Sequence, residues 1–148
     1  MTTPGAAAPA HLSPLTAEHC ERLLRRHHFG RIAVHGRDGL AIFPVNYVYA
    51  DGRLAIRTEP GAKLAAAVQS EVAFEIDEIN ETTRAGWSVM VAGTAFEVAD
   101  TVDDVSVALR DLEVDSWAGE RTRWLRIEPR AITGRALSDP GFPAADGG

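Results

Sequence analysis

The chain has 148 residues, of which 45% are hydrophobic and 24% are charged, values typical of one soluble globular domain. Its formal net charge of -6 at pH 7 argues against general binding to nucleic acid or to an anionic membrane surface. No apolar run approaches the roughly 20 residues that cross a bilayer.

The two ends of the chain differ in composition from its middle. Residues 1–13 are rich in alanine and proline and lack the basic and apolar regions of a signal peptide, so they predict a disordered arm. Residues 138–148 predict a flexible tail, which leaves residues 14–137 as one domain. The single cysteine, Cys20, excludes an internal disulfide and favours a cytoplasmic location.

The first half of the domain predicts one helix and three strands. Residues 15–27 have helical apolar spacing, with Thr16 as the N-cap. Residues 30–36 alternate apolar and polar, as a half-buried strand does, and residues 40–50 form a more apolar second strand. Asp51-Gly52 is a strong hairpin signal before a third strand at residues 53–58.

The second half continues this strand-rich pattern. Residues 71–79, 86–100 and 122–137 predict strands, whereas residues 61–68 and 102–112 predict helices. Six strands joined mostly by hairpins indicate a mainly β fold, an antiparallel barrel with peripheral helices. Pro44 within the second strand indicates a local edge or a bulge, because proline cannot donate to a strand ladder.

The end of the third strand carries a candidate anion site. Lys63 is the one lysine in a chain with 14 arginines, and it follows Arg57 and Thr58 through a Glu-Pro-Gly turn into a predicted helix. A guanidinium, a hydroxyl and an ammonium group near a helix N-terminus together suit a phosphate. The spacing alone leaves open the alternative that Lys63 is simply solvated and that Arg57 covers apolar surface.

The other polar clusters predict no catalytic or metal site. His27 and His28 are adjacent and lack acidic or thiolate partners at ligand spacing, so we expect no metal. Cys20 and His19 are helix neighbours that do not face each other. The acidic residues of the fourth strand are expected on its solvent side and at its end: Glu75, Asp77 and Glu78.

The order of these segments resembles the pyridoxamine 5'-phosphate oxidase-like family of flavin-binding split barrels. The segments that carry the resemblance are residues 30–68, 72–79 and 86–98, and the likeness extends from about Leu15 to Arg135. The resemblance implies a six-stranded split barrel that forms a homodimer, with FMN in each of two clefts between the subunits.

The resemblance also assigns roles to individual residues. It implies that Arg57 and Thr58 contact the phosphate and ribityl chain and that Lys63 is the phosphate-binding base. It further implies that a segment of the second strand and the start of the fifth strand border the isoalloxazine ring: Pro44, Val45 and Asn46, with Trp87 and Ser88. Trp124 is expected either in the core or as a wall of the cleft.

The C-terminus departs from the family's namesake enzymes. Those enzymes resemble one another in a C-terminal segment with basic residues and a histidine that hold the substrate's phosphate, whereas residues after Arg135 here contain neither. We therefore expect an FMN-dependent oxidoreductase with a different small-molecule substrate, and the catalytic residues stay unassigned. An F420-dependent reductase, a non-catalytic flavin or haem binder, and a purely structural barrel remain open alternatives.

Overall fold

The structure, a computed structural model, describes residues 11–36, 38–58, 69–98 and 123–138. The helix expected at residues 15–27 and all six expected strands are present, and their ends differ from the predicted ones by at most two residues. The predicted helices at residues 61–68 and 102–112 lie outside the described residues. The observed elements are β1 (His11–Pro14), α1 (Ala17–Arg26), β2 (Phe29–Gly36), β3 (Gly39–Ala50), β4 (Arg53–Thr58), β5 (Glu71–Asn80), β6 (Ala85–Val98) and β7 (Arg123–Ser138).

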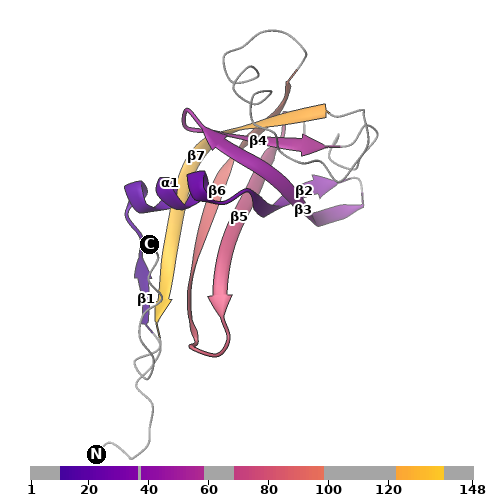
Figure 1. Ribbon diagram of the computed structural model, residues 1–148. Helices are drawn as coiled ribbons and strands as arrows, with labels where there is room; N and C mark the ends of the chain where they lie inside the picture. Colours follow the sequence, from indigo (N-terminus) through magenta and orange to yellow (C-terminus); the bar gives the residue numbers. More distant parts are fainter. Residues whose placement is uncertain (1–10, 37, 59–68, 99–122, 139–148) are drawn as a thin grey trace, which may run out of the picture.

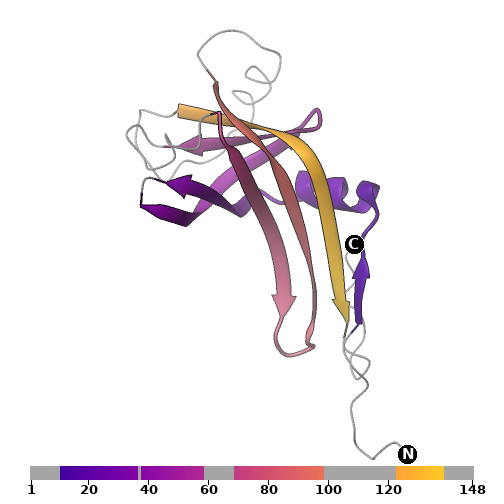
Figure 2. The same ribbon diagram turned by 180° about the vertical axis from the view of Figure 1, so that it is seen from behind.

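The strands form one antiparallel sheet that closes on itself (Figures 1 and 2). Its order is β1-β7-β4-β3-β2-β5-β6, and β6 also pairs with β7, so β2 to β7 make a six-stranded barrel. β6 and β7 pair from Gly86 to Val98, whereas β2 and β5 pair only from Arg31 to Ala33. The strand pattern thus correctly predicted a closed antiparallel barrel, and the uneven pairing gives the split barrel that the family resemblance implied.

Strict alternation along the strands separates an inner face from an outer face. In β5, Val72, Phe74 and Ile76 are buried inside the barrel, and the residues between them point outward. Burial of apolar surface is the main force that holds such a barrel together. The largest side chains that are almost completely buried there are Tyr47, Phe74, Leu24, Ile32, Leu54, Ile56, Ile76 and Ile127.

Helix α1 completes this core because its apolar stripe packs against inner-face residues of β3, β6 and β7. Thr16 caps the helix as predicted, since its side-chain oxygen accepts a hydrogen bond from the His19 N–H. The Tyr47 hydroxyl donates to the Leu24 carbonyl oxygen at 2.8 Å. Burial raises the pKa of Tyr47, so its hydroxyl keeps the proton that it donates.

A bulge in β7 changes which residues of that strand face inward. The register pairs Pro129 with Gly93 and Ala131 with Ala92, so Arg130 is an extra residue. Before the bulge the inward residues are odd-numbered, as shown by Leu125 and Ile127, and after it they are even-numbered, as shown by Gly134.

The strand β1 was not expected from the sequence. It pairs with the C-terminal end of β7, from His11 with Ser138 to Pro14 with Arg135. The prediction of a disordered arm is therefore wrong for residues 11–13, which a neighbouring strand orders. The sheet gains a seventh strand that lies outside the closed ring.

Replacing Gly30 by alanine should destabilise the fold. A Cβ at this inward position would lie 2.5 Å from Phe74 Cζ and 2.7 Å from the Glu75 carbonyl oxygen. Overpacking of this kind typically costs about 1–3 kcal/mol, which urea denaturation would measure. Gly36→Ala is the matched control on the same strand, because its Cβ meets only the Gly39 carbonyl oxygen, at 3.3 Å. Equal loss in the two variants would contradict this account.

Candidate functional site

The end of β4 presents Arg57 on the outer face of the barrel. Ile56 is fully buried, so the next residue points outward, and the register pairs Arg57 with Trp124 on β7. The Arg57 guanidinium carbon lies 5.8 Å from the centre of the Trp124 ring, a cation–π contact. The ring thus holds the guanidinium at the end of the strand.

Asn46 extends this row of outward side chains onto β3. The register of β3 with β4 ends at the pair Tyr47 and Ile56, and continuing it by one residue sets Asn46 beside Arg57. Trp124 also packs against Val48 and Ala55, which form a small apolar cluster outside the main core. We call Asn46, Arg57 and Trp124 the strand-end row.

Next to the strand-end row, β7 carries a second outward arginine that contacts an aromatic ring. Arg126 lies over the Phe96 ring at 5.6 Å, and its Nε is 3.0 Å from the Glu128 carboxylate. Arg53 bonds to the same carboxylate at 3.0 Å. This ion-paired network is the neighbour of the strand-end row along the outer face.

Thr58 and Lys63 belong to the same predicted phosphate site. Thr58 is the last residue of β4 and pairs with Arg123 at the start of β7, so its backbone lies next to the strand-end row. Lys63 lies outside the described residues, and its role stays a prediction.

Pro44 and Val45 precede Asn46 on β3 and face opposite sides. Val45 is buried in the core, so its side chain does not line an outer cleft, whereas Pro44 is exposed. Among the described strands, residues 39–46 pair only with β2, because β4 joins β3 from Tyr47 onward. This part of β3 is a local edge, as predicted from Pro44, and its register with β2 has no bulge.

Trp87 and Ser88 lie at the opposite end of β6 from the level of Trp124, although across the sheet only β5 and β2 separate Ser88 from the Pro44–Asn46 segment of β3. They are near the start of β6, whereas Val98 at its other end pairs with Trp124. The 11 steps along the strand from Trp87 to Val98 span roughly 35 Å of extended chain. Trp87 is buried, with its ring centroid 5.0 Å from that of His27, so its side chain belongs to the core.

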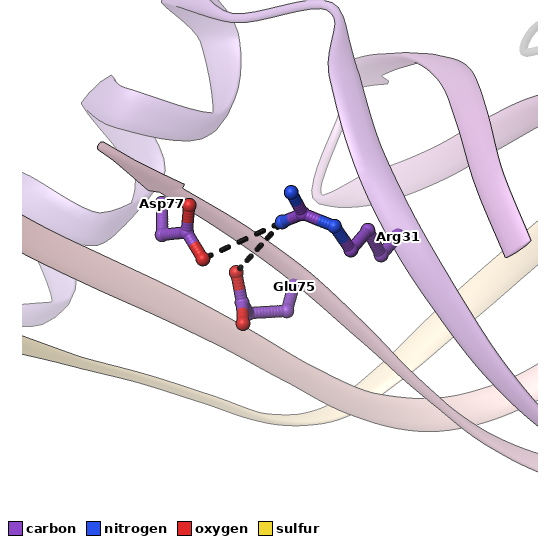
Figure 3. Close-up of polar contacts among 3 residues, drawn as sticks. All are labelled: Arg31, Glu75 and Asp77. Carbon is purple, nitrogen blue, oxygen red and sulfur yellow. Dashed lines mark hydrogen bonds and ion pairs between the residues drawn. The ribbon is translucent and has the colours of Figure 1, made fainter. Parts of the chain in front are cut away.

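Sequence reasoning missed a polar cluster on the outer face of β2 and β5. Arg31 Nη1 lies 3.5 Å from Asp77 Oδ2 and 3.9 Å from Glu75 Oε1 (Figure 3). The two carboxylates stand two residues apart on one strand, so they share a face. That spacing was visible in the sequence, but the pairing of Arg31 with Glu75 depends on strand register.

The proximity of the two carboxyl groups changes the protonation of Glu75. Its hydrogen bond with Asp77, its partial burial and the charge of Asp77 raise its pKa from 4.5 to about 7, although Arg31 opposes the shift. A protonated Glu75 can donate to the Asp77 carboxylate, so near neutral pH the two groups share one proton.

The described residues contain no group of three or more His, Cys, Asp and Glu side chains that could hold a metal ion. Burial raises the pKa of the Cys20 thiol, which opposes formation of a nucleophilic thiolate. Within the same described ranges, no helix is both long enough and apolar enough to cross a bilayer.

The closed six-stranded antiparallel barrel places the chain in the class of split-barrel proteins. The family model for pyridoxamine 5'-phosphate oxidase matches residues 16–136. The chain therefore belongs to the pyridoxamine 5'-phosphate oxidase family, as its segment order indicated.

Individual relatives support this assignment. An uncharacterized protein of Mycobacterium tuberculosis is 34% identical over 137 residues, which cover 87% of this chain and 88% of the relative. The FAD-binding protein of Mycobacterium smegmatis is 34% identical, with a TM-score of 0.71 over 84% of this chain and 98% of that one. An FAD-binding protein of Mesorhizobium loti is 24% identical with a TM-score of 0.74, over 88% and 100% of the two chains, and shows the fold.

The raised pKa of Glu75 predicts a pH-dependent loss of stability. Between pH 4.5 and about 7 the folded chain holds a proton that the unfolded chain has released, so the contribution of this proton to stability falls as pH rises through that window. Glu75→Gln should remove this fall, and chemical denaturation at pH 5, 6, 7 and 8 would measure it. Glu81→Gln, in the exposed turn between β5 and β6, is the control. A Glu75→Gln variant with the wild-type pH profile would contradict the shared proton.

Proposed function

We propose that the protein binds FMN at the end of β4 and uses it as an oxidoreductase acting on a small organic substrate. The observation that carries this proposal is the outward Arg57, held against Trp124 beside Asn46 at the strand end. A guanidinium with fixed orientation suits the phosphate oxygens of a flavin nucleotide. The 34% identity to an FAD-binding protein favours a flavin as the ligand.

The polar groups of the strand-end row and its neighbours suit such a ligand. Arg57 and Lys63 would neutralise the phosphate, and the backbone at Thr58 offers polar groups at the strand end. Asn46 offers amide donors and an acceptor to a polar edge of the ring. When bound, flavin supplies hydride transfer, while the protein's residues bind it, orient it and exclude water from part of it.

The exposed apolar residues of the outer face support a site shared by two protomers. Only β5 and β2 separate Ser88 from the Pro44–Asn46 segment of β3 across the sheet, so one partner chain could cover both regions. We infer that a homodimer completes each site, as the family resemblance implies. The core position of Trp87 leaves Ser88, which is half-buried on the outer face, as the contact residue of that strand.

The protein is proposed to work in the cytoplasm, in keeping with its single buried cysteine. F420 and haem are the alternative cofactors to set beside FMN and FAD in a binding screen.

Arg57→Gln should weaken FMN binding by about 1.5–3 kcal/mol, the loss expected for a hydrogen bond to a charged group, or roughly 10- to 150-fold. Fluorescence titration of the folded variant with FMN and FAD would measure it. Arg53→Gln is the matched control, since Arg53 lies on the same face of β4 but bonds to Glu128. Unchanged FMN affinity in Arg57→Gln, or equal loss in both variants, would contradict the site. Reduction of the bound ring by NADPH or NADH would separate an enzyme from a carrier.

Lys63→Ala should weaken FMN binding on the same scale, about 1.5–3 kcal/mol, because it removes a charge-assisted bond to phosphate. Calorimetric titration of the variant, with its fold checked by circular dichroism, would measure the change. Riboflavin, which has the same ring and no phosphate, is the matched ligand control. A Lys63→Ala variant that loses riboflavin and FMN affinity equally would remove this lysine from the phosphate contact.

A further inference from the structure

The outer face of β2, β3, β5 and β6 exposes large apolar side chains. Phe29 is 57% exposed, Ile42 67% and Met90 46%. The strand registers and the two-residue side-chain period place them all on the outer side of the sheet. We call the set the apolar outer patch: Phe29, Leu40, Ile42, Ile79 and Met90. Single chains rarely leave such a patch in contact with water, so it marks an interaction surface.

The Arg31–Glu75–Asp77 cluster, whose three side chains Figure 3 shows, lies among these residues on the same outer face. The strand register sets Arg31 between Pro44 and Glu75, and Glu75 between Arg31 and Met90. Phe29 is two residues from Arg31 on the same face of β2. A partner that covers the apolar residues must therefore also cover the charges.

The charges of this cluster do not balance when both carboxylates are ionised. Within the described strands, Arg31 is the one cation that forms ion pairs with them. Met90 and Ser88 on β6 and Pro44 on β3 are uncharged, and the next cation on this face, Arg135 of β7, lies beyond Ser88. On β5 itself the outward neighbours, Ala73 and Ile79, are uncharged as well. Each chain thus carries one excess negative charge among the residues of the patch.

Oxygen Oε1 of Glu75 is buried and has no hydrogen-bond partner, because Arg31 Nη1, at 3.9 Å, is too far to donate to it. A proton on Glu75 removes this defect, because its hydroxyl then donates to Asp77. Covering the cluster would raise the cost of the unneutralised charge further, since an unpaired charge is expensive to take out of water.

We propose that a second copy of this chain docks on the apolar outer patch, and that each copy takes up a proton at its Arg31–Glu75–Asp77 cluster when it does so. This rests on the homodimer of the proposed function and adds its surface and its control. Two copies related by a twofold axis bring two cations and four carboxylates together, so one proton per copy restores neutrality. The mixed charges favour a second copy over nucleic acid or an anionic membrane, which need a uniformly basic surface.

The position of the patch supports the same partner. It lies between the Pro44–Asn46 segment of β3 and Ser88 of β6, the two regions expected to border the ring. A copy docked over the patch would cover both regions. The interface and the proposed flavin site would then be continuous.

Fluorescence-detected sedimentation of the full chain, at constant ionic strength from pH 6 to 9, tests the proposal. Proton uptake on association requires the dimer to weaken as pH rises above about 7, by up to roughly tenfold per pH unit for each proton taken up. Glu75→Gln should abolish this dependence and keep the dimer tight at pH 8.5. Glu81→Gln should keep the wild-type dependence.

Met90→Asp tests the surface itself and should abolish the dimer throughout this pH range, whereas Leu12→Asp, at an exposed apolar site on β1, should not. An unchanged dimer in Met90→Asp would overturn the docking face. A wild-type dimer whose affinity ignores pH, or a wild-type pH dependence in Glu75→Gln, would overturn the proton linkage. A wild-type chain that is monomeric at all pH values would overturn both.

Flavin binding, titrated separately at pH 6.5, distinguishes this proposal from the proposed function. Wild-type protein that binds FMN but shows no proton-linked dimer would leave the flavin site standing and remove the linkage. A proton-linked dimer that binds no flavin would do the reverse.

Discussion

Closure of the barrel by the pairing of β6 with β7 is the constraint on which the rest of the structure depends. A closed ring has only one interior, and here large apolar side chains and helix α1 fill it. Functional polar groups must therefore lie outside, on the alternate residues of the same strands. This is why Arg57 and Asn46 lie on the outer face while Val45 and Trp87, which the family resemblance assigned to the same site, belong to the core.

Local patterns were sufficient to predict most of the fold. Period-two alternation located six strands, the Thr16 cap located α1, and Asp51-Gly52 located a hairpin whose residues have φ of 52° and 74°. β1 could not be found in this way, because four residues with a proline show no alternation, and the strand exists through its pairing with β7. This strand therefore depends on a tertiary contact that no local sequence pattern indicates.

The candidate site was predictable in part, and the limits have physical causes. Arg57 and Thr58 could be placed at a strand end from the sequence, and their proximity to Trp124 follows from pairing between residues far apart in the chain. The alternation rule, applied to Val45 and Trp87, would have predicted their inward direction. The Arg31–Glu75–Asp77 cluster needed the β2–β5 register, which joins segments separated by more than 40 residues.

The extra residue at Arg130 has a consequence for how this chain can change over time. Before this residue the inward side chains of β7 are odd-numbered, and after it they are even-numbered. Loss of one residue there would turn the polar Thr133 and Arg135 toward the interior, or else turn Trp124 and Arg126 away from solvent. A substitution at Arg130 keeps these inward positions, whereas a deletion does not. The number of residues in this segment is therefore under a stronger evolutionary constraint than their identity.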